Sequence, residues 1–123
     1  MRLRDLVRDR AVWLYLLITC GFFYGPLTTQ TFFFRDLFQC WYPRKVLFAE
    51  ALRAGTFPLW DPFTNGGQPY LAMPAYTALH PSNLLYAILP AIVAFNVILV
   101  VHIFLCAVGA YWLGGVIGLW QNA

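Results

Sequence analysis

Two long apolar runs without charged residues flank a polar middle segment in this chain. No Asp, Glu, Lys or Arg occurs at residues 11–34, and none occurs at residues 81–123. A helix rises about 1.5 Å per residue and the hydrocarbon core of a bilayer is about 30 Å thick, so each run is long enough to cross a membrane. The pattern predicts an all-α integral membrane fold with transmembrane helices at residues 12–29 and 91–119.

The second apolar run is longer than one span requires, and Pro90 is its natural interruption because proline cannot continue a helix. We therefore expect a short helix at residues 82–89 before the second span. Small residues crowd the distal half of that span, and small side chains let helices approach closely in a bilayer. This half is expected to pack against other helices through Ala107, Gly109, Ala110, Gly114, Gly115 and Gly118.

The first apolar run has an alternative interpretation as a cleaved secretory signal. A basic start followed by an apolar stretch describes such signals, and Leu17-Ile18-Thr19-Cys20 resembles a lipoprotein cleavage box. The apolar run continues well past Cys20, and Thr19 is an unfavourable residue before the cut. We therefore favour an uncleaved transmembrane helix.

Residues 30–81, between the two spans, carry most of the charged side chains. Burying Asp, Lys or Arg at the centre of a bilayer costs about 2.5 to 3.5 kcal/mol each. We therefore expect this segment to be a long loop outside the lipid. Its charged residues are Arg35, Asp36, Arg44, Lys45, Glu50, Arg53 and Asp61.

A short helix at residues 43–54 is expected inside this loop. Pro43 suits the first turn of a helix and Gly55 suits the position after the last turn. Its apolar stripe fits a helix lying in the membrane interface, or an amphipathic helix packed on the protein's own helices. The stripe consists of Trp41, Phe48 and Leu52.

The stretch after this helix is expected to be an ordered loop without regular secondary structure. Residues 56–69 contain several prolines and two adjacent glycines, which interrupt helices and strands. Within them, Asn65-Gly66 is a strong turn signal.

Composition and charge agree with a membrane location. Hydrophobic residues make up 61% of the chain, charged residues make up 11%, and the mean hydropathy is +0.65, whereas charged residues are about 25% of typical soluble domains. The net charge of +3 is small and the basic residues do not alternate with aromatic residues, so nucleic acid is not an expected partner. The expected partners are membrane lipid and further helices, from a longer chain or from other subunits.

The basic residues predict an orientation. Residues 1–11 carry four arginines directly before the first apolar run, and cytoplasmic ends are enriched in Lys and Arg. Residues 30–81 also carry four basic residues, but these are spread over a longer stretch. We therefore expect a cytoplasmic N-terminus and an extracytoplasmic loop at residues 30–81.

Several blocks of the loop, taken in order, resemble the N-terminal part of the bacterial YfhO-like membrane proteins. The blocks are Phe34–Arg44, Glu50–Pro62 and Asn65–Pro69, and residues 79–84 and 102–118 continue the resemblance. That family is similar to the GT-C glycosyltransferases, polytopic enzymes of the cell envelope that take a sugar from a polyprenyl-phosphate carrier. The resemblance implies a GT-C-like fold, in the bacterial cytoplasmic (inner) membrane, of which this chain forms the first two spans.

The resemblance also implies a catalytic residue. The first outer loop of GT-C enzymes bears an essential acidic residue soon after the first span, and Asp36 is at the matching position. Asp36 is therefore expected to act as a base toward the acceptor hydroxyl, or as a ligand of a divalent metal ion if one is used. This fragment alone is expected to be inactive. Asp61 departs from the family pattern, in which Asn is more common.

Side chains near Asp36 in the sequence are expected to bind the lipid-linked sugar donor. Basic groups neutralise phosphate, and amides and aromatic rings suit the recognition of sugar hydroxyls. The predicted substrate-binding residues are Arg35, Gln39, Tyr42, Arg44, Lys45, Asp61, Asn65, Gln68 and His80.

Structural alternatives exist for the ionisable members of this set. Asp36 could instead pair with Arg35 or Arg44 at the membrane surface, Asp61 could be a turn residue bonded to its own backbone, and His80 could be a hydrogen-bonded loop residue. The three cysteines have no metal-type spacing and are expected to be inert.

The alternative function is a non-enzymatic small membrane protein that assembles with other helices through its glycine-rich second span. Transport is a third interpretation, with His102 as the ionisable residue within the spans.

Overall fold

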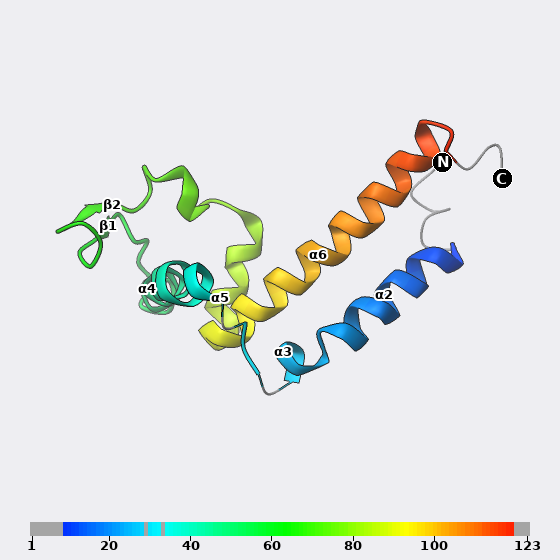
Figure 1. Ribbon diagram of the computed structural model, residues 1–123. Helices are drawn as coiled ribbons and strands as arrows, with labels where there is room; N and C mark the ends of the chain where they lie inside the picture. The colour runs from blue at the N-terminus through cyan, green and yellow to red at the C-terminus, as the bar shows by residue number, and fades with distance from the viewer. Residues whose placement is uncertain (1–8, 29, 33, 120–123) are drawn as a thin grey trace. The chain divides into compact units, whose positions relative to one another are not determined.

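The computed structural model describes residues 9–28, 30–32 and 34–119. The chain divides into two compact units, Met1–Gln30 with Val97–Ala123, and Thr31–Asn96. Figure 1 labels the α-helices of both units and the two strands of a small hairpin in the second unit. Most of the predicted basic N-terminus, residues 1–8, lies outside the described residues.

The first apolar run forms two consecutive helices, α2 (Arg10–Phe22) and α3 (Tyr24–Thr28). The carboxylate of Asp9 accepts a hydrogen bond from the N–H of Ala11 at 2.9 Å and caps the start of α2. The helix is interrupted at Phe23 because Pro26 has no N–H to donate to the carbonyl of Phe22. This differs from the single helix predicted over residues 12–29, and a first span is not shown.

The second apolar run forms α6 (Ala91–Val116), a helix of 26 residues. It is long and apolar enough to cross a membrane, with a mean hydropathy of 2.7 in its most apolar part. The helix ends before residue 119 because Gly118 adopts a positive φ of 81° and the N–H of Leu119 bonds back to the carbonyl of Gly114. Of the described helices, α6 alone meets the length and composition of a span.

In the first unit, the start of α2 lies beside the end of α6 (Figure 1). The hydroxyl of Tyr111 donates a hydrogen bond to the carboxylate of Asp9 at 2.7 Å, and the ring of Tyr15 packs edge-on against that of Tyr111. Among the small residues expected to pack, Gly114 is buried, whereas Gly109 and Ala110 are exposed.

In the second unit, a π-helical turn, η1 (Leu37–Trp41), leads directly into α4 (Tyr42–Arg53). The wide turn has a local cause. Pro43 lacks an N–H and its ring would clash with the preceding turn of a regular helix, so the N–H of Tyr42 bonds five residues back, to Leu37. Helix α4 lies within one residue of the predicted helix at 43–54 and is followed by Gly55 at φ 70°.

The stretch predicted to lack regular structure contains a small hairpin, so that prediction is wrong. Strands β1 (Trp60–Asp61) and β2 (Gln68–Pro69) are antiparallel, with Asp61 opposite Gln68. Asn65 and Gly66 both have positive φ, 52° and 75°, and the N–H of Gly67 bonds to the carbonyl of Thr64 at 2.8 Å. This mirror-image turn reverses the chain within the loop at residues 62–67 that connects β1 to β2.

After the hairpin the chain makes three short helical segments, η2 (Pro74–Tyr76), η3 (Pro81–Leu84) and α5 (Leu85–Ile88). The last two replace the helix predicted at residues 82–89. Pro90 separates them from α6, as the sequence predicts.

Aromatic rings form the core of the second unit. Phe48 is only 2% exposed, and its ring packs against Tyr70, Phe57 and Tyr86 at centroid distances of 5.9, 5.6 and 6.4 Å. The centre of the apolar stripe on α4 is therefore covered by this unit's own residues. For Phe48 this agrees with the packed alternative and not with contact to headgroups.

Candidate functional site

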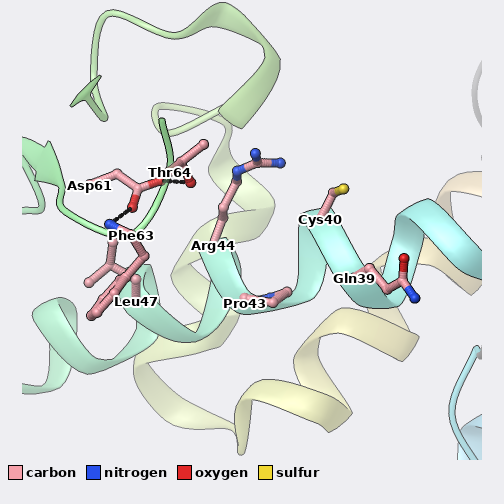
Figure 2. A pocket seen from close by; sticks show the side chains of 8 residues that line it. All are labelled: Gln39, Cys40, Pro43, Arg44, Leu47, Asp61, Phe63 and Thr64. Carbon is pink, nitrogen blue, oxygen red and sulfur yellow. Dashed lines mark hydrogen bonds between the residues drawn. The ribbon is translucent and has the colours of Figure 1, made fainter. Parts of the chain in front are cut away.

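A cavity of about 200 Å³ lies between the first half of α4 and the hairpin. Its polar wall is made by Gln39, Arg44, Asp61 and Thr64, and Cys40 lies at the same wall. Figure 2 shows Arg44 extending from α4 beside the segment that carries Asp61 and Thr64. The structure thus brings together three of the predicted substrate-binding residues, Gln39, Arg44 and Asp61.

Asp61 is 1% exposed, and both oxygens of its carboxylate accept hydrogen bonds. One oxygen accepts the backbone N–H of Phe63 at 2.9 Å, and the other accepts the hydroxyls of Thr64 at 2.7 Å and Tyr76 at 3.1 Å. The first of these bonds is the turn contact that sequence analysis gave as the structural alternative. The other two connect the hairpin to residues after it.

These bonds set the charge of Asp61. Burial acts to raise its pKa, but the hydrogen bonds from Thr64, Phe63 and Tyr76, together with the positive charge of Arg44, outweigh burial and place the pKa below its usual value. A carboxylate with a lowered pKa, whose oxygens already accept three hydrogen bonds, is a poor proton acceptor at neutral pH. Asp61 therefore organises the cavity wall and is not suited to general-base catalysis.

Arg44 carries the positive charge of the cavity. Its guanidinium lies over the ring of Tyr76 at 4.9 Å and near that of Trp41 at 5.6 Å, which are cation–π distances. Its Nε is buried and has no hydrogen-bond partner within the described part of the chain. A buried donor without a partner is costly, about 1 to 3 kcal/mol, so this N–H would gain an oxygen partner from the cavity only if the Arg44 side chain moved to expose it.

Tyr76 joins the remaining predicted residues of the hairpin to this wall. Gln68 donates to the hydroxyl of Tyr76, and Asn65 donates to the side-chain oxygen of Gln68 at 3.3 Å. Sequence reasoning missed Tyr76, because no local pattern connects it to a residue fifteen positions earlier. It also missed Thr64, for which the Asp-x-x-Thr spacing at Asp61 was an available signal.

Lys45 does not line the cavity, and its ammonium group forms hydrogen bonds within the second unit. Its Nζ donates to the carbonyl of Tyr76 at 2.8 Å and to side-chain oxygens of Thr77 and Asn83 at 3.1 Å each. An ammonium group has three donors, so none remains for a phosphate. Burial lowers the pKa of Lys45 to about 8, which leaves it mainly protonated at neutral pH.

Asp36 and Arg35 lie outside the cavity, at the start of the helical segment that leads into η1. Both side chains are exposed. Within the described residues, the Asp36 carboxylate makes no hydrogen bond and no ion pair, so neither predicted pairing, with Arg35 or with Arg44, is present there.

The other predicted residues also lie apart from the cavity. Tyr42 stacks on Phe38 at 5.5 Å and meets the edge of Phe95 at 5.7 Å. His80 accepts the backbone N–H of Ser82 through Nδ1 at the start of η3, the hydrogen-bonded loop role of the structural alternative, and lines a second, apolar pocket with Phe57.

The part of the chain that the structure describes contains no preformed cluster of metal-ligating side chains. There, no group of three or more His, Cys, Asp or Glu side chains converges. The cysteines at positions 20, 40 and 106 are free thiols. No protein-family model, curated protein or solved structure matches this chain.

Proposed function

We propose that this chain is the N-terminal part of a polytopic, glycosyltransferase-like membrane protein that takes a sugar from a polyprenyl-phosphate donor at the outer face of the bacterial cytoplasmic membrane. The proposal extends the resemblance of residues 34–69 to the YfhO-like family. It is supported by α6, which is long and apolar enough to hold the chain in a membrane.

The observation that carries the proposal is the free carboxylate of Asp36. It is exposed, and no described residue pairs with it. A general base must have an oxygen that is free to take the proton of the hydroxyl group that will receive the sugar. In the proposed reaction, Asp36 takes the hydroxyl proton, the hydroxyl oxygen bonds to the anomeric carbon, and the bond from that carbon to the phosphate oxygen breaks. Polyprenyl phosphate leaves with the bonding electrons.

Two arginines are suited to the phosphate of the donor. Arg35 is exposed next to Asp36, and Arg44 lines the cavity with an Nε that lacks a described partner. Guanidinium groups bind phosphate through short, charge-assisted hydrogen bonds. Lys45 is left out of the proposed site because its donors are already engaged.

The test is Asp36→Asn in the full-length protein, assayed with a panel of synthetic polyprenyl-phosphate hexoses in membranes. We expect transfer to fall by a factor of about 100 or more, since general-base catalysis contributes 10²–10⁴-fold. Glu50→Gln is the matched control, because Glu50 is an exposed carboxylate on α4. Normal transfer by an Asp36→Asn variant that is expressed at the normal level would exclude the catalytic role.

A second candidate is a non-enzymatic protein that assembles with other helices. Gly109 on α6 is exposed, and a Cβ added to it would have nothing within 4 Å, so another helix could approach closely there. Cross-linking between cysteines introduced at position 109 of two copies in membranes would favour this function.

A further inference from the structure

The segment after α4 presents a surface without formal charge. Between Arg53 and His80, Asp61 is the only charged residue in the sequence. Because Asp61 is buried and its carboxylate is held by internal hydrogen bonds, residues 54–79 expose no charged side chain. The exposed charges of this unit lie in the earlier helical segment, at Arg35, Asp36, Glu50 and Arg53.

Large apolar side chains are exposed on this uncharged surface. They lie in residues 57–71, which include the hairpin and which we call the hairpin segment. Phe63, near the turn, is 83% exposed, and Trp60 on β1 is 56% exposed. The remaining exposed apolar side chains of the segment are Phe57, Leu59 and Leu71. A concentration of exposed apolar side chains in one short segment favours contact with another apolar phase or partner.

Part of the backbone of the hairpin segment is hydrogen-bonded within the segment. The N–H of Tyr70 bonds to the carbonyl of Leu59 and that of Gly67 to the carbonyl of Thr64, both at 2.8 Å. The ring of Trp60 packs against Gly67, where an added Cβ would lie 2.8 Å from the nearest ring atom. The absence of a side chain at Gly67 therefore leaves room for the ring. These bonds reduce the cost of removing the loop from water.

We propose that the hairpin segment rests in the neutral headgroup region of the bilayer that α6 crosses. Tryptophan and other amphipathic aromatic side chains concentrate at this depth. A lipid partner is favoured over a protein partner for two reasons. The surface offers no charge for partner selection, and the chain continues from this unit into the apolar helix α6, which keeps the unit close to a membrane. The inference depends on anchoring by α6 and not on the transfer reaction.

The test measures the depth of a fluorescent label in the full chain, reconstituted in phosphatidylcholine vesicles. The native cysteines 20, 40 and 106 are replaced by serine, and a single NBD label is attached at Phe63→Cys or, as a second reporter, at Leu59→Cys. Both side chains are exposed, so the label displaces no core contact. Glu50→Cys is the control on the charged surface, and Leu105→Cys on α6 is the control for anchoring.

We expect phosphatidylcholine spin-labelled near the headgroup to quench labels 59 and 63 at least twofold more than label 50, and aqueous iodide to show the reverse order. The proposal is overturned if iodide quenches label 63 as strongly as label 50. It is also overturned if label 63 is protected from both quenchers, because protein would then cover the segment. Absence of lipid quenching at position 105 would overturn it by removing the anchor.

Discussion

The ammonium nitrogen of Lys45 lies 2.8 Å from the backbone carbonyl oxygen of Tyr76, and this contact joins α4 to the chain that follows the hairpin. The same nitrogen donates to Thr77 and Asn83. Asn83 is itself buried, and its amide nitrogen donates to the carbonyls of Thr77 and Ala78. Lys45 is therefore an internal cross-link of the second unit.

Replacing this cross-link should destabilise the second unit. Lys45→Met keeps the length of the side chain but removes the Lys45 donor from the buried side-chain oxygen of Asn83 and leaves the Tyr76 carbonyl with the Thr77 hydroxyl. We expect a loss of about 1 to 3 kcal/mol in the free energy of unfolding. Guanidinium unfolding in mild detergent, followed by near-ultraviolet circular dichroism, measures this loss. The control Glu50→Gln should change it by less than about 0.5 kcal/mol. Equal stability of the two variants would contradict the role of Lys45.

Sequence patterns predicted the features of this fold that have local causes. Pro90 separates α5 from α6, Gly55 follows α4, and Asn65-Gly66 makes a turn. Each depends on the allowed φ of one or two residues or on a missing N–H, so a short window contains all the information.

The long-range contacts of the second unit were not predictable in this way. Lys45 bonds to a carbonyl 31 residues away, and Tyr76 reaches a carboxylate 15 residues before it. Neither residue type nor spacing signals such pairs. The first apolar run was predicted as one helix from its length and composition, and the hydrogen bond that Pro26 removes divides it into α2 and α3.

The stability of the hairpin should fall in acid through Asp61. Its pKa is lowered in the folded state from the usual 3.8, so the unfolded chain binds this proton more readily. The stabilisation is therefore complete above about pH 4 and is lost as the pH falls through the folded-state pKa. Asp61→Asn should be less stable than wild type at pH 6, and the difference should narrow toward pH 3. A difference that stays constant over this range would show that Asp61 is not held ionised by the fold.

The two glycines of the hairpin turn should differ in their tolerance of a methyl group. Both have positive φ, 75° at Gly66 and 112° at Gly67, so alanine is strained at either position by about 1 to 2 kcal/mol. Only at Gly67 would the added Cβ also meet the ring of Trp60. Gly67→Ala should therefore lower the free energy of unfolding more than Gly66→Ala, and it should alter the fluorescence of Trp60. Equal losses would place the Trp60 ring elsewhere.

Arg44 and Asp36 should affect different kinetic constants of the proposed transfer. Arg44→Gln removes the positive charge of the cavity, and a charge-assisted hydrogen bond is worth about 1.5 to 3 kcal/mol, so KM for the polyprenyl-phosphate donor should rise about tenfold or more. Arg44→Lys keeps the charge but loses the planar contact with the rings of Tyr76 and Trp41, so its KM should be intermediate.

These different effects on KM and kcat distinguish a donor-binding role of Arg44 from a structural role. Because Asp36 is proposed to act on the acceptor hydroxyl, Asp36→Asn should lower kcat with little change in KM for the donor. If Arg44 only supports the hairpin through Tyr76, its variants should lose stability while the folded fraction keeps the wild-type KM. Steady-state kinetics on the full-length protein, normalised to the folded fraction, decides between these outcomes, because only a residue that contacts the donor phosphate raises KM in molecules that remain folded.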